Sequence, residues 1–184
     1  GAEVVIADVD ETGAEAATSE LGDEGIEALA VACDVTDRDE TAVMVDETVD
    51  CFGGVDILVN NAGISTRANF TELEPGQWDD VIDVNLTGVF NCTHAALSEL
   101  VDGVGAVVNI SSMAGRNISY HAAANYTASK WGVVGLTKHL AWDLADHDVR
   151  VNAVCPGSTL TPLIEAETTP EARGETAEKI PLNR

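Results

Sequence analysis

Short apolar runs rich in β-branched residues alternate along the chain with longer stretches whose apolar positions recur at helical spacing. The short runs predict strands at Val4–Val9, Glu27–Cys33, Val55–Asn60, Ala106–Ser111 and Val149–Val154. The longer stretches predict helices at Glu11–Leu21, Asp37–Cys51, Gln77–Leu100 and Asn125–Ala145. A β-α unit repeated in this way is typical of a parallel sheet with helices on both faces, and right-handed crossovers make it doubly wound. The sequence therefore predicts an α/β, Rossmann-like fold in a single domain over residues 1–184.

The alternation weakens after Pro156-Gly157, where Thr, Pro and Glu dominate. Residues 158–180 are interpreted as a substrate flap, although the dispersed acids taken alone are more typical of a solvated surface helix. No internal repeat or linker divides the chain.

The charge balance limits the classes of partner. The chain has 32 Asp plus Glu against 9 Lys plus Arg, a net charge of −23. Nucleic acids and anionic membranes attract clustered cations, so neither is expected to bind. The start of the chain lacks the features of a signal peptide, and no apolar run approaches membrane-spanning length. A soluble, cytoplasmic protein is expected.

The cysteines point the same way. Cys33, Cys51, Cys92 and Cys155 are widely spaced and form no Cys-x-x-Cys pair. This spacing favours free thiols in a reducing compartment over a metal site, and no metal is expected.

Polar or glycine-containing residues follow every predicted strand, where doubly wound sheets bind their ligands. They are Asp8, Asp34-Val35, Asn60-Asn61-Ala62-Gly63, Ser111-Ser112 and Pro156-Gly157. An Asp in the place of Asp8 is suited to hydrogen-bond an adenosine ribose, but taken alone it is more often the cap of the helix that follows. Neighbouring Asn residues can tie strands together, or can simply form a turn.

Tyr126 and Lys130 form the strongest chemical pair. They lie four residues apart in a predicted helix, so the phenol and the ammonium share one face. A nearby cation stabilises a phenolate, which would let Tyr126 exchange a proton with a substrate oxygen. Such a pair taken alone is usually just part of a helix surface.

Several further motifs accompany this pair in a fixed order. They are Asn60-Asn61-Ala62-Gly63, Val84-Asn85-Leu86-Thr87-Gly88, Asn109-Ile110-Ser111-Ser112, Arg150 to Gly157 and Pro181-Leu182-Asn183-Arg184. With them the chain resembles the short-chain dehydrogenase/reductase family over nearly its whole length, and in particular the members that reduce 3-oxoacyl thioesters.

The resemblance implies a catalytic set of Asn85, Ser112, Tyr126 and Lys130. Tyr126 would be the acid/base, Ser112 would hydrogen-bond the reacting oxygen, and Asn85 would support a proton relay. The cofactor would contact Asp8, Asp34, Val35, Asn61, Ala62, Gly63, Tyr126, Lys130, Pro156, Gly157, Thr159 and Thr161. Asp8 would favour NAD over NADP, because a carboxylate repels a 2′-phosphate.

The chain departs from the family pattern in two ways. Ser112 and Tyr126 are one residue further apart than is usual, which we assign to the loop between Gly115 and Ala124; Ser111 is the alternative catalytic serine. No glycine-rich turn for a pyrophosphate is present, since Gly103-Val104-Gly105 precedes a strand instead of following one. By resemblance the first strand, which would lie between those at Val4 and Val55, and the final strand are missing. We therefore expect a fragment that is inactive and poorly folded alone.

Two functions compete at this point. The first is an oxidoreductase that transfers a hydride between NAD and a secondary alcohol or ketone. The second is a non-catalytic nucleotide-binding or assembly module of the same fold. The residues expected to face a substrate are mixed in character and select no compound: Ser65, Thr66, Met113, Arg116, His121, Thr159, Leu163 and Ile164.

The acids are unevenly distributed. No Asp or Glu lies between Asp102 and Asp143, a stretch that contains Lys130. By resemblance, the helices at 77–100 and 125–145 form the interface of a homodimer or homotetramer. Elsewhere the acid excess, with only three Lys in the chain, suggests a halophilic surface adapted to high salt.

Overall fold

The computed structural model describes residues 1–160, 168–178 and 180. Its strands are β1 (Val4–Asp8), β2 (Ala28–Ala32), β3 (Ile57–Asn60), β4 (Ala106–Ile110) and β5 (Arg150–Val154). Its α-helices are α1 (Glu11–Asp23), α2 (Arg38–Phe52), α3 (Pro75–Ile82), α4 (Gly88–Ala95), α5 (Leu97–Asp102), α6 (Ala124–Asp143) and α8 (Pro170–Glu178). Shorter turns are η1 (Asp83–Thr87), η2 (Met113–Gly115) and η3 (Ala145–His147). The predicted order of strands and helices is confirmed, with boundaries that differ by a few residues.

The strands form two separate parallel groups. β1 pairs with β2, and β4 pairs with β3 on one side and β5 on the other. Among the described residues no pairing joins β1 to β3. The break falls at the position where the sequence predicted a missing strand. It leaves each of these two strands with an edge whose backbone groups have no ladder partner.

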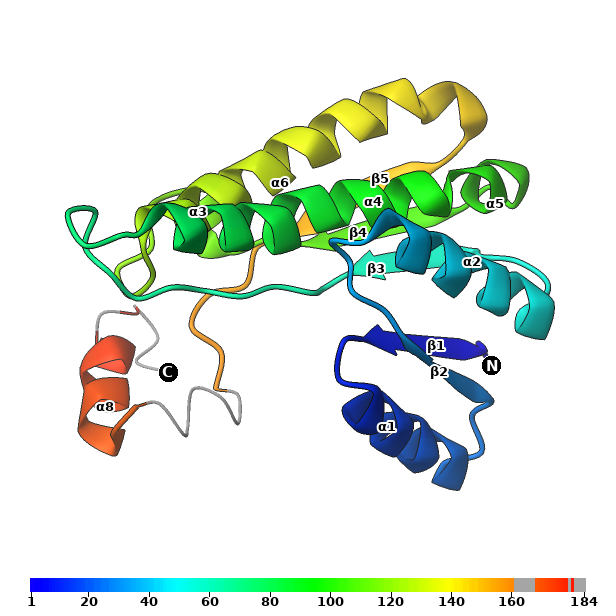
Figure 1. The fold of residues 1–184 in the computed structure, drawn as a ribbon, viewed down its shortest axis with the longest axis horizontal. Helices are drawn as coiled ribbons and strands as arrows, with labels where there is room; N and C mark the ends of the chain where they lie inside the picture. The colour runs from blue at the N-terminus through cyan, green and yellow to red at the C-terminus, as the bar shows by residue number, and fades with distance from the viewer. Residues whose placement is uncertain (161–167, 179, 181–184) are drawn as a thin grey trace.

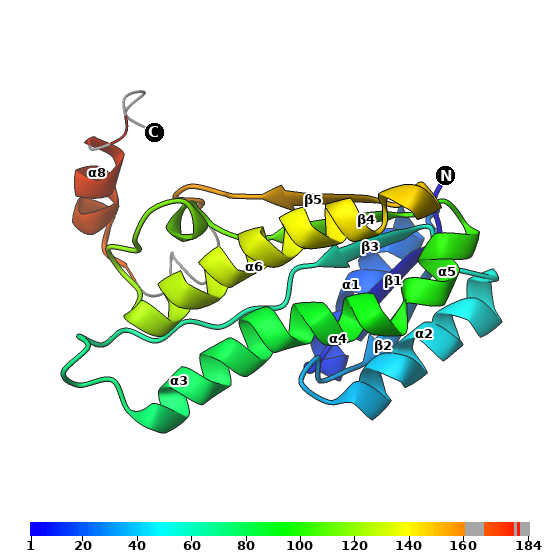
Figure 2. The same cartoon turned by 90° about the horizontal axis from the view of Figure 1, so that it is seen from above.

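The helices cover the strands unequally. α2, α4 and α6 follow one another along one face, whereas α1 packs on β1 and β2 from the opposite face (Figures 1 and 2). Helices therefore lie on both faces of the β1–β2 pair, as predicted. On β3, the alternate residues Ile57 and Val59 are 64% and 53% exposed on the face away from α4.

One apolar core joins the two strand groups through the packing of α2 against α4. Leu100 and Val107 are fully buried at its centre. The other buried members come from both groups and are Val31, Cys33, Met44, Val45, Cys92, Ala96, Leu144, Val149 and Val151. Since β1 and β3 do not pair, this core and the α2–α4 contact hold the two parts together.

The single helix predicted over Gln77–Leu100 is wrong in detail. The helix begins earlier, at Pro75, where a proline is pre-organised for the first turn and Glu74 and Gln77 form a capping box. It then widens into a π turn at η1, where the N–H of Gly88 donates to the carbonyl of Asp83, and it breaks again at Ala96.

The segment predicted as a substrate flap contains α8. Residues 161–167, which include the predicted site residues Thr161, Leu163 and Ile164, lie outside the described part, as do 179 and the motif at 181–184. Within the described residues, no helix has the length and apolarity needed to cross a membrane.

Candidate active site

The π turn η1 carries Asn85 into the middle of the molecule. Its side chain is fully buried, accepts a hydrogen bond from the N–H of Ile64 at 2.8 Å and donates to the carbonyl of Ile64 at 2.9 Å. It also donates to the hydroxyl of Ser129 at 3.1 Å. A π turn commonly marks a functional site, because it redirects side chains within a helix. Asn85 thereby links the segment after β3 to helix α6.

Lys130 extends from α6 toward the end of β4. Its Nζ donates to the carbonyl of Ile110 at 2.9 Å and lies 5.7 Å from the centroid of the Tyr126 ring. The residue is only 5% exposed, and burial lowers the pKa of its ammonium below the ordinary value. The predicted pairing of Tyr126 with Lys130 on one helix face is therefore present.

The backbone of Tyr126 is fixed on both sides by two buried residues. Its N–H donates to Asn125 Oδ1 at 2.8 Å, and its carbonyl accepts from the Ser129 hydroxyl at 2.8 Å. Asn125 in turn donates to the carbonyl of Gln77 in α3 at 2.8 Å. Neither Asn125 nor Ser129 was predicted from the sequence. The sequence offered little signal for them, because Thr127 is an equally polar neighbour of Tyr126.

The two serines after β4 have different environments. Ser111 is 4% exposed, and its hydroxyl donates to the carbonyl of Lys130 at 2.9 Å. Ser112 is half-buried, and its hydroxyl accepts from the N–H of Ala114 at 3.1 Å, which leaves its own proton available for another acceptor. This difference favours Ser112 over Ser111 as the group that contacts a substrate oxygen.

Asn60 ties the strands together, one of the two roles the sequence left open. Its Nδ2 donates to Asn109 Oδ1 at 2.8 Å and to the Thr93 hydroxyl at 3.0 Å. Asn109, its register partner on β4, donates to the Thr137 hydroxyl at 2.9 Å. A buried polar chain thus runs from α4 through two strands to α6.

The candidate cofactor residues lie at the carboxyl ends of the strands. Asn61, Ala62 and Gly63 are exposed directly after β3, and a Cβ at Gly63 would lie 3.3 Å from Asn85 Oδ1 and 3.5 Å from Lys130 Nζ. A side chain at this position would crowd the space next to Asn85 and Lys130. Pro156 accepts a hydrogen bond from the N–H of Met113, and Thr159 is exposed beyond Gly157.

Asp8 is exposed at the end of β1, and Asp34 and Val35 are partly buried after β2. Helix α1 is capped by Asp10, whose side chain accepts from the N–H of Gly13. Asp8 instead accepts from the N–H of Asp10 at 3.0 Å. The alternative in which Asp8 caps the helix is therefore wrong, and its carboxylate stands at the strand end where a ribose would be bound. The residues present therefore fit both the adenosine end and the nicotinamide end of a nicotinamide dinucleotide.

The residues expected to face a substrate are dispersed. Thr66 accepts a hydrogen bond from the N–H of Ala123 and so lies at the start of α6, while Ser65 and Met113 are exposed. Arg116 and His121 are also exposed. An open hollow of about 720 Å³ lies between α6 and β5 and is lined by Arg116, Trp131 and Lys138 among others. It includes none of the four catalytic candidates, so we do not assign the substrate to it.

Comparison with known proteins agrees with this geometry. The family model for short chain dehydrogenase matches residues 1–172. The 3-oxoacyl-[acyl-carrier-protein] reductase FabG of Staphylococcus aureus strain Mu50 is 40% identical over 172 residues, which are 93% of this chain and 69% of that protein.

Two solved structures are similar as well. The 3-oxoacyl-[acyl-carrier protein] reductase of Brucella melitensis has a TM-score of 0.91 and 38% identity, over 99% of this chain and 69% of that one. A gluconate 5-dehydrogenase of Burkholderia cenocepacia, solved with NADP and tartrate, has a TM-score of 0.91 and 32% identity, over 100% and 72%. The chain belongs to the short chain dehydrogenase family, oxidoreductases that act on hydroxyl and keto groups with a nicotinamide cofactor.

Proposed function

We propose that the chain carries the catalytic centre of an NAD-dependent oxidoreductase that interconverts a secondary alcohol and a ketone. The observation that supports this most is the hydrogen-bonded link from Asn85 through the Ser129 hydroxyl to the backbone of Tyr126. Beside it, the bond to the carbonyl of Ile110 holds Lys130 Nζ 5.7 Å from the Tyr126 ring. A centre held by so many buried bonds is pre-organised for proton transfer. The acid-free stretch supports the same proposal, since it forms β4, η2 and nearly all of α6.

Reduction of a ketone requires a hydride at carbon and a proton at oxygen. A bound nicotinamide cofactor would supply the hydride, or accept it in oxidation. Tyr126 donates its phenolic proton to the substrate oxygen, and Ser112 donates a hydrogen bond to the same oxygen. Lys130 stabilises the phenolate and would hold the nicotinamide ribose of a bound cofactor, while Asn85 supports a water-linked path that restores the proton.

The decisive experiment replaces the phenol. It uses a chimaera in which this chain is joined to the segments of the S. aureus reductase outside the matched region. Tyr126→Phe is expected to lower kcat at least 1,000-fold while NADH still binds. Tyr120→Phe is the matched control, because Tyr120 is 80% exposed six residues earlier, and it should retain full activity. Equal turnover of the two variants would favour a non-catalytic nucleotide-binding module instead.

The preference for NAD rests on Asp8. A carboxylate at the end of β1 can accept hydrogen bonds from both ribose hydroxyls and repels a 2′-phosphate. We expect the chimaera to bind NADH at least tenfold more tightly than NADPH, and Asp8→Asn to reduce that ratio. A preference for NADPH in the unaltered protein would overturn this assignment. The Burkholderia dehydrogenase was solved with NADP, so both cofactors have to be measured side by side.

The substrate class follows from the relatives only as a hypothesis. Two of the relatives described above are named as 3-oxoacyl-[acyl-carrier-protein] reductases, and one is named as a gluconate dehydrogenase. We infer that a 3-oxoacyl thioester is the first compound to test, followed by sugar acids. Oxidation of NADH or reduction of NAD, followed by absorbance, identifies the preferred member of this panel.

We also propose that the protein is a homodimer or homotetramer through the surfaces of α3–α5 and α6. Phe90 on α4 and Trp131 and Trp142 on α6 are large apolar side chains that are exposed in the single chain. Sedimentation of the chimaera as a monomer would contradict this. The net charge of −23 leads us to expect greater stability in molar salt.

A further inference from the structure

The loop Asp34–Asp37, between β2 and α2, has a shape fixed by its own hydrogen bonds. The Asp34 side chain accepts from the N–H and the hydroxyl of Thr36 at 2.9 and 2.8 Å, and the Asp34 N–H donates to Glu40 Oε2 at 2.7 Å. Asp37 caps α2. All of these bonds lie within one short stretch of chain. They determine the conformation of the loop but not its position relative to the catalytic residues.

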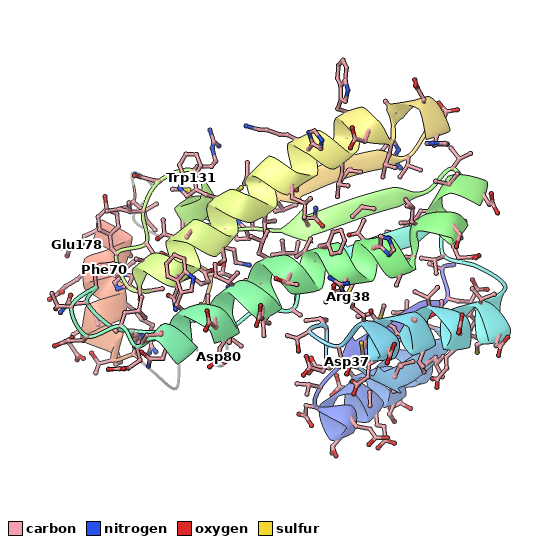
Figure 3. The ribbon with its side chains drawn as sticks, turned by 45° about the horizontal axis from the view of Figure 1, so that its top comes forward. Asp37, Arg38, Phe70, Asp80, Trp131 and Glu178 are labelled. Carbon is pink, nitrogen blue, oxygen red and sulfur yellow. The ribbon has the colours of Figure 1, made fainter. Side chains whose placement is uncertain are left out.

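Asn91 on α4 supplies the hydrogen bonds that fix this position. The residue is 3% exposed, and its Nδ2 donates to the carbonyl of Val35 at 2.9 Å and to that of Thr36 at 3.4 Å. Its Oδ1 accepts from Arg38 Nε at 3.2 Å, and the Arg38 guanidinium lies 5.7 Å from the centroid of the Phe90 ring. Figure 3 shows Arg38 between the start of α2 and α4.

Gly88, one helical turn earlier, receives the side chain of the same loop. A Cβ at Gly88 would lie 2.6 Å from Val35 Cγ2 and 3.0 Å from Val35 Cβ, so Val35 packs directly on the helix backbone. Residues three apart share a helix face. Gly88 therefore leaves space for the side chain of Val35, and Asn91 donates a hydrogen bond to the carbonyl of the same residue.

By the family resemblance, Asp34 and Val35 would flank the adenine of the cofactor. We propose that Gly88 and Asn91 are positioning residues that set the loop Asp34–Asp37 relative to the catalytic centre. The proposal rests on the proposed function. The loop contacts α4 through these two residues, and α4 continues from the π turn that carries Asn85, so the α2–α4 contact sets the distance between the loop and the catalytic centre. A dinucleotide must contact both ends at once, so a displaced loop loses the adenosine contacts while the nicotinamide end is unchanged.

The test compares the Kd of NADH with that of reduced nicotinamide mononucleotide, in the chimaera described above. Asn91→Leu removes the donor to Val35, and Asn91→Asp removes it while keeping an acceptor for Arg38. Gly88→Ala displaces Val35 independently. Each variant is expected to raise the Kd of NADH at least tenfold, with less than a twofold change in the Kd of reduced nicotinamide mononucleotide, which has no adenosine. Arg38→Met, which leaves the bond from Asn91 to Val35 intact, should change the Kd of NADH less than threefold.

An unchanged Kd for NADH in Asn91→Leu and Gly88→Ala would overturn the proposal. So would an equal loss of affinity for both ligands, or loss of cooperative melting in all three variants of Gly88 and Asn91, because either result assigns these residues to the fold alone. If the unaltered chimaera binds neither ligand, the proposed function itself fails, and this is seen before any variant is measured.

Discussion

The two strand groups differ in how their interiors are built. In the region from β3 to β5, residues 57–154, the buried polar or charged residues are Asn60, Asn85, Asn91, Thr93, Asn109, Ser111, Asn125, Ser129, Lys130 and Thr137. In the region from β1 to α2, residues 4–52, Thr41 is the only one among the described residues. The first region has a hydrogen-bonded interior and the second has an apolar interior.

This difference follows from what each region is proposed to do. Proton transfer requires the reacting groups to be positioned to within a fraction of an ångström. A buried network in which every polar group is hydrogen-bonded provides that precision, but the loss of any member strongly destabilises the fold. Recognition of an adenosine needs one well-placed loop and a carboxylate at the surface. The region from β1 to α2 therefore relies on caps at Asp10 and Asp37 and on its contact with α4.

The largest effect on folding and activity is expected when a strand fills the gap between β1 and β3 and so joins the two regions. β1 and β3 each have an unpaired edge, so the 184-residue chain alone should melt without a sharp transition and show no turnover. The chimaera, which offers a strand for the gap, should melt cooperatively and oxidise NADH with a suitable ketone. Circular dichroism and absorbance measure both. Turnover by the isolated chain would show that the gap is tolerated.

A second prediction concerns the packing of the catalytic region. A Cβ at Gly115 would lie 2.5 Å from Ser111 Oγ and 2.6 Å from the carbonyl oxygen of Lys130, and the latter is backbone that cannot rotate away. Gly115→Ala should therefore lower the free energy of unfolding of the chimaera by about 3 kcal/mol in urea. Gly135→Ala is the matched control, because nothing lies within 4 Å of its Cβ and alanine favours the helix. Equal stability of the two variants would mean that the site is not tightly packed around Gly115.

The third prediction compares one buried polar residue from each region. Asn60→Leu leaves Asn109 Oδ1 without its donor and should lower the free energy of unfolding by about 2 kcal/mol. Thr41→Val removes one local bond, from the hydroxyl to the carbonyl of Arg38, and should cost under about 1 kcal/mol. A reversed order in urea titrations would mean that the polar network does not stabilise the catalytic region.

The smallest effect concerns the thiols where the two regions meet. Burial raises the pKa of Cys33 to about 11 and that of Cys92 to about 12. Because the thiolate is the reactive form, both should resist iodoacetamide at pH 8 and react faster as the pH rises toward these values. Cys51 is exposed and should be alkylated at least tenfold faster at pH 8, as mass spectrometry would show. Rapid labelling of Cys92 would indicate that α4 separates easily from the region containing β1 to α2.

Much of this arrangement could be predicted from the sequence. The strands and most helices follow from hydrophobic periodicity, and the catalytic candidates follow from motifs such as Asn60 to Gly63 that keep a fixed order. The π turn could not be predicted, because no residue of Asp83 to Thr87 specifies a wide turn, and the hydrogen-bond partner of Asn85 is the backbone of Ile64, 21 residues earlier. Asn91 was missed for a similar reason. Its partners, the carbonyls of Val35 and Thr36, are backbone atoms far away in the sequence, and no local pattern marks them.

The π turn also changes the direction in which the side chains of α4 point, relative to those of α3. A residue advances an α-helix by about 100°, and a turn that accommodates one extra residue changes the phase of everything after it by a similar amount. Helix α3, whose Gln77 carbonyl supports Asn125, and helix α4, which contacts Val35, are thereby oriented independently although the chain passes through them without a loop. A single wide turn thus allows one continuous helical segment to contact two different partners, Asn125 through α3 and Val35 through α4.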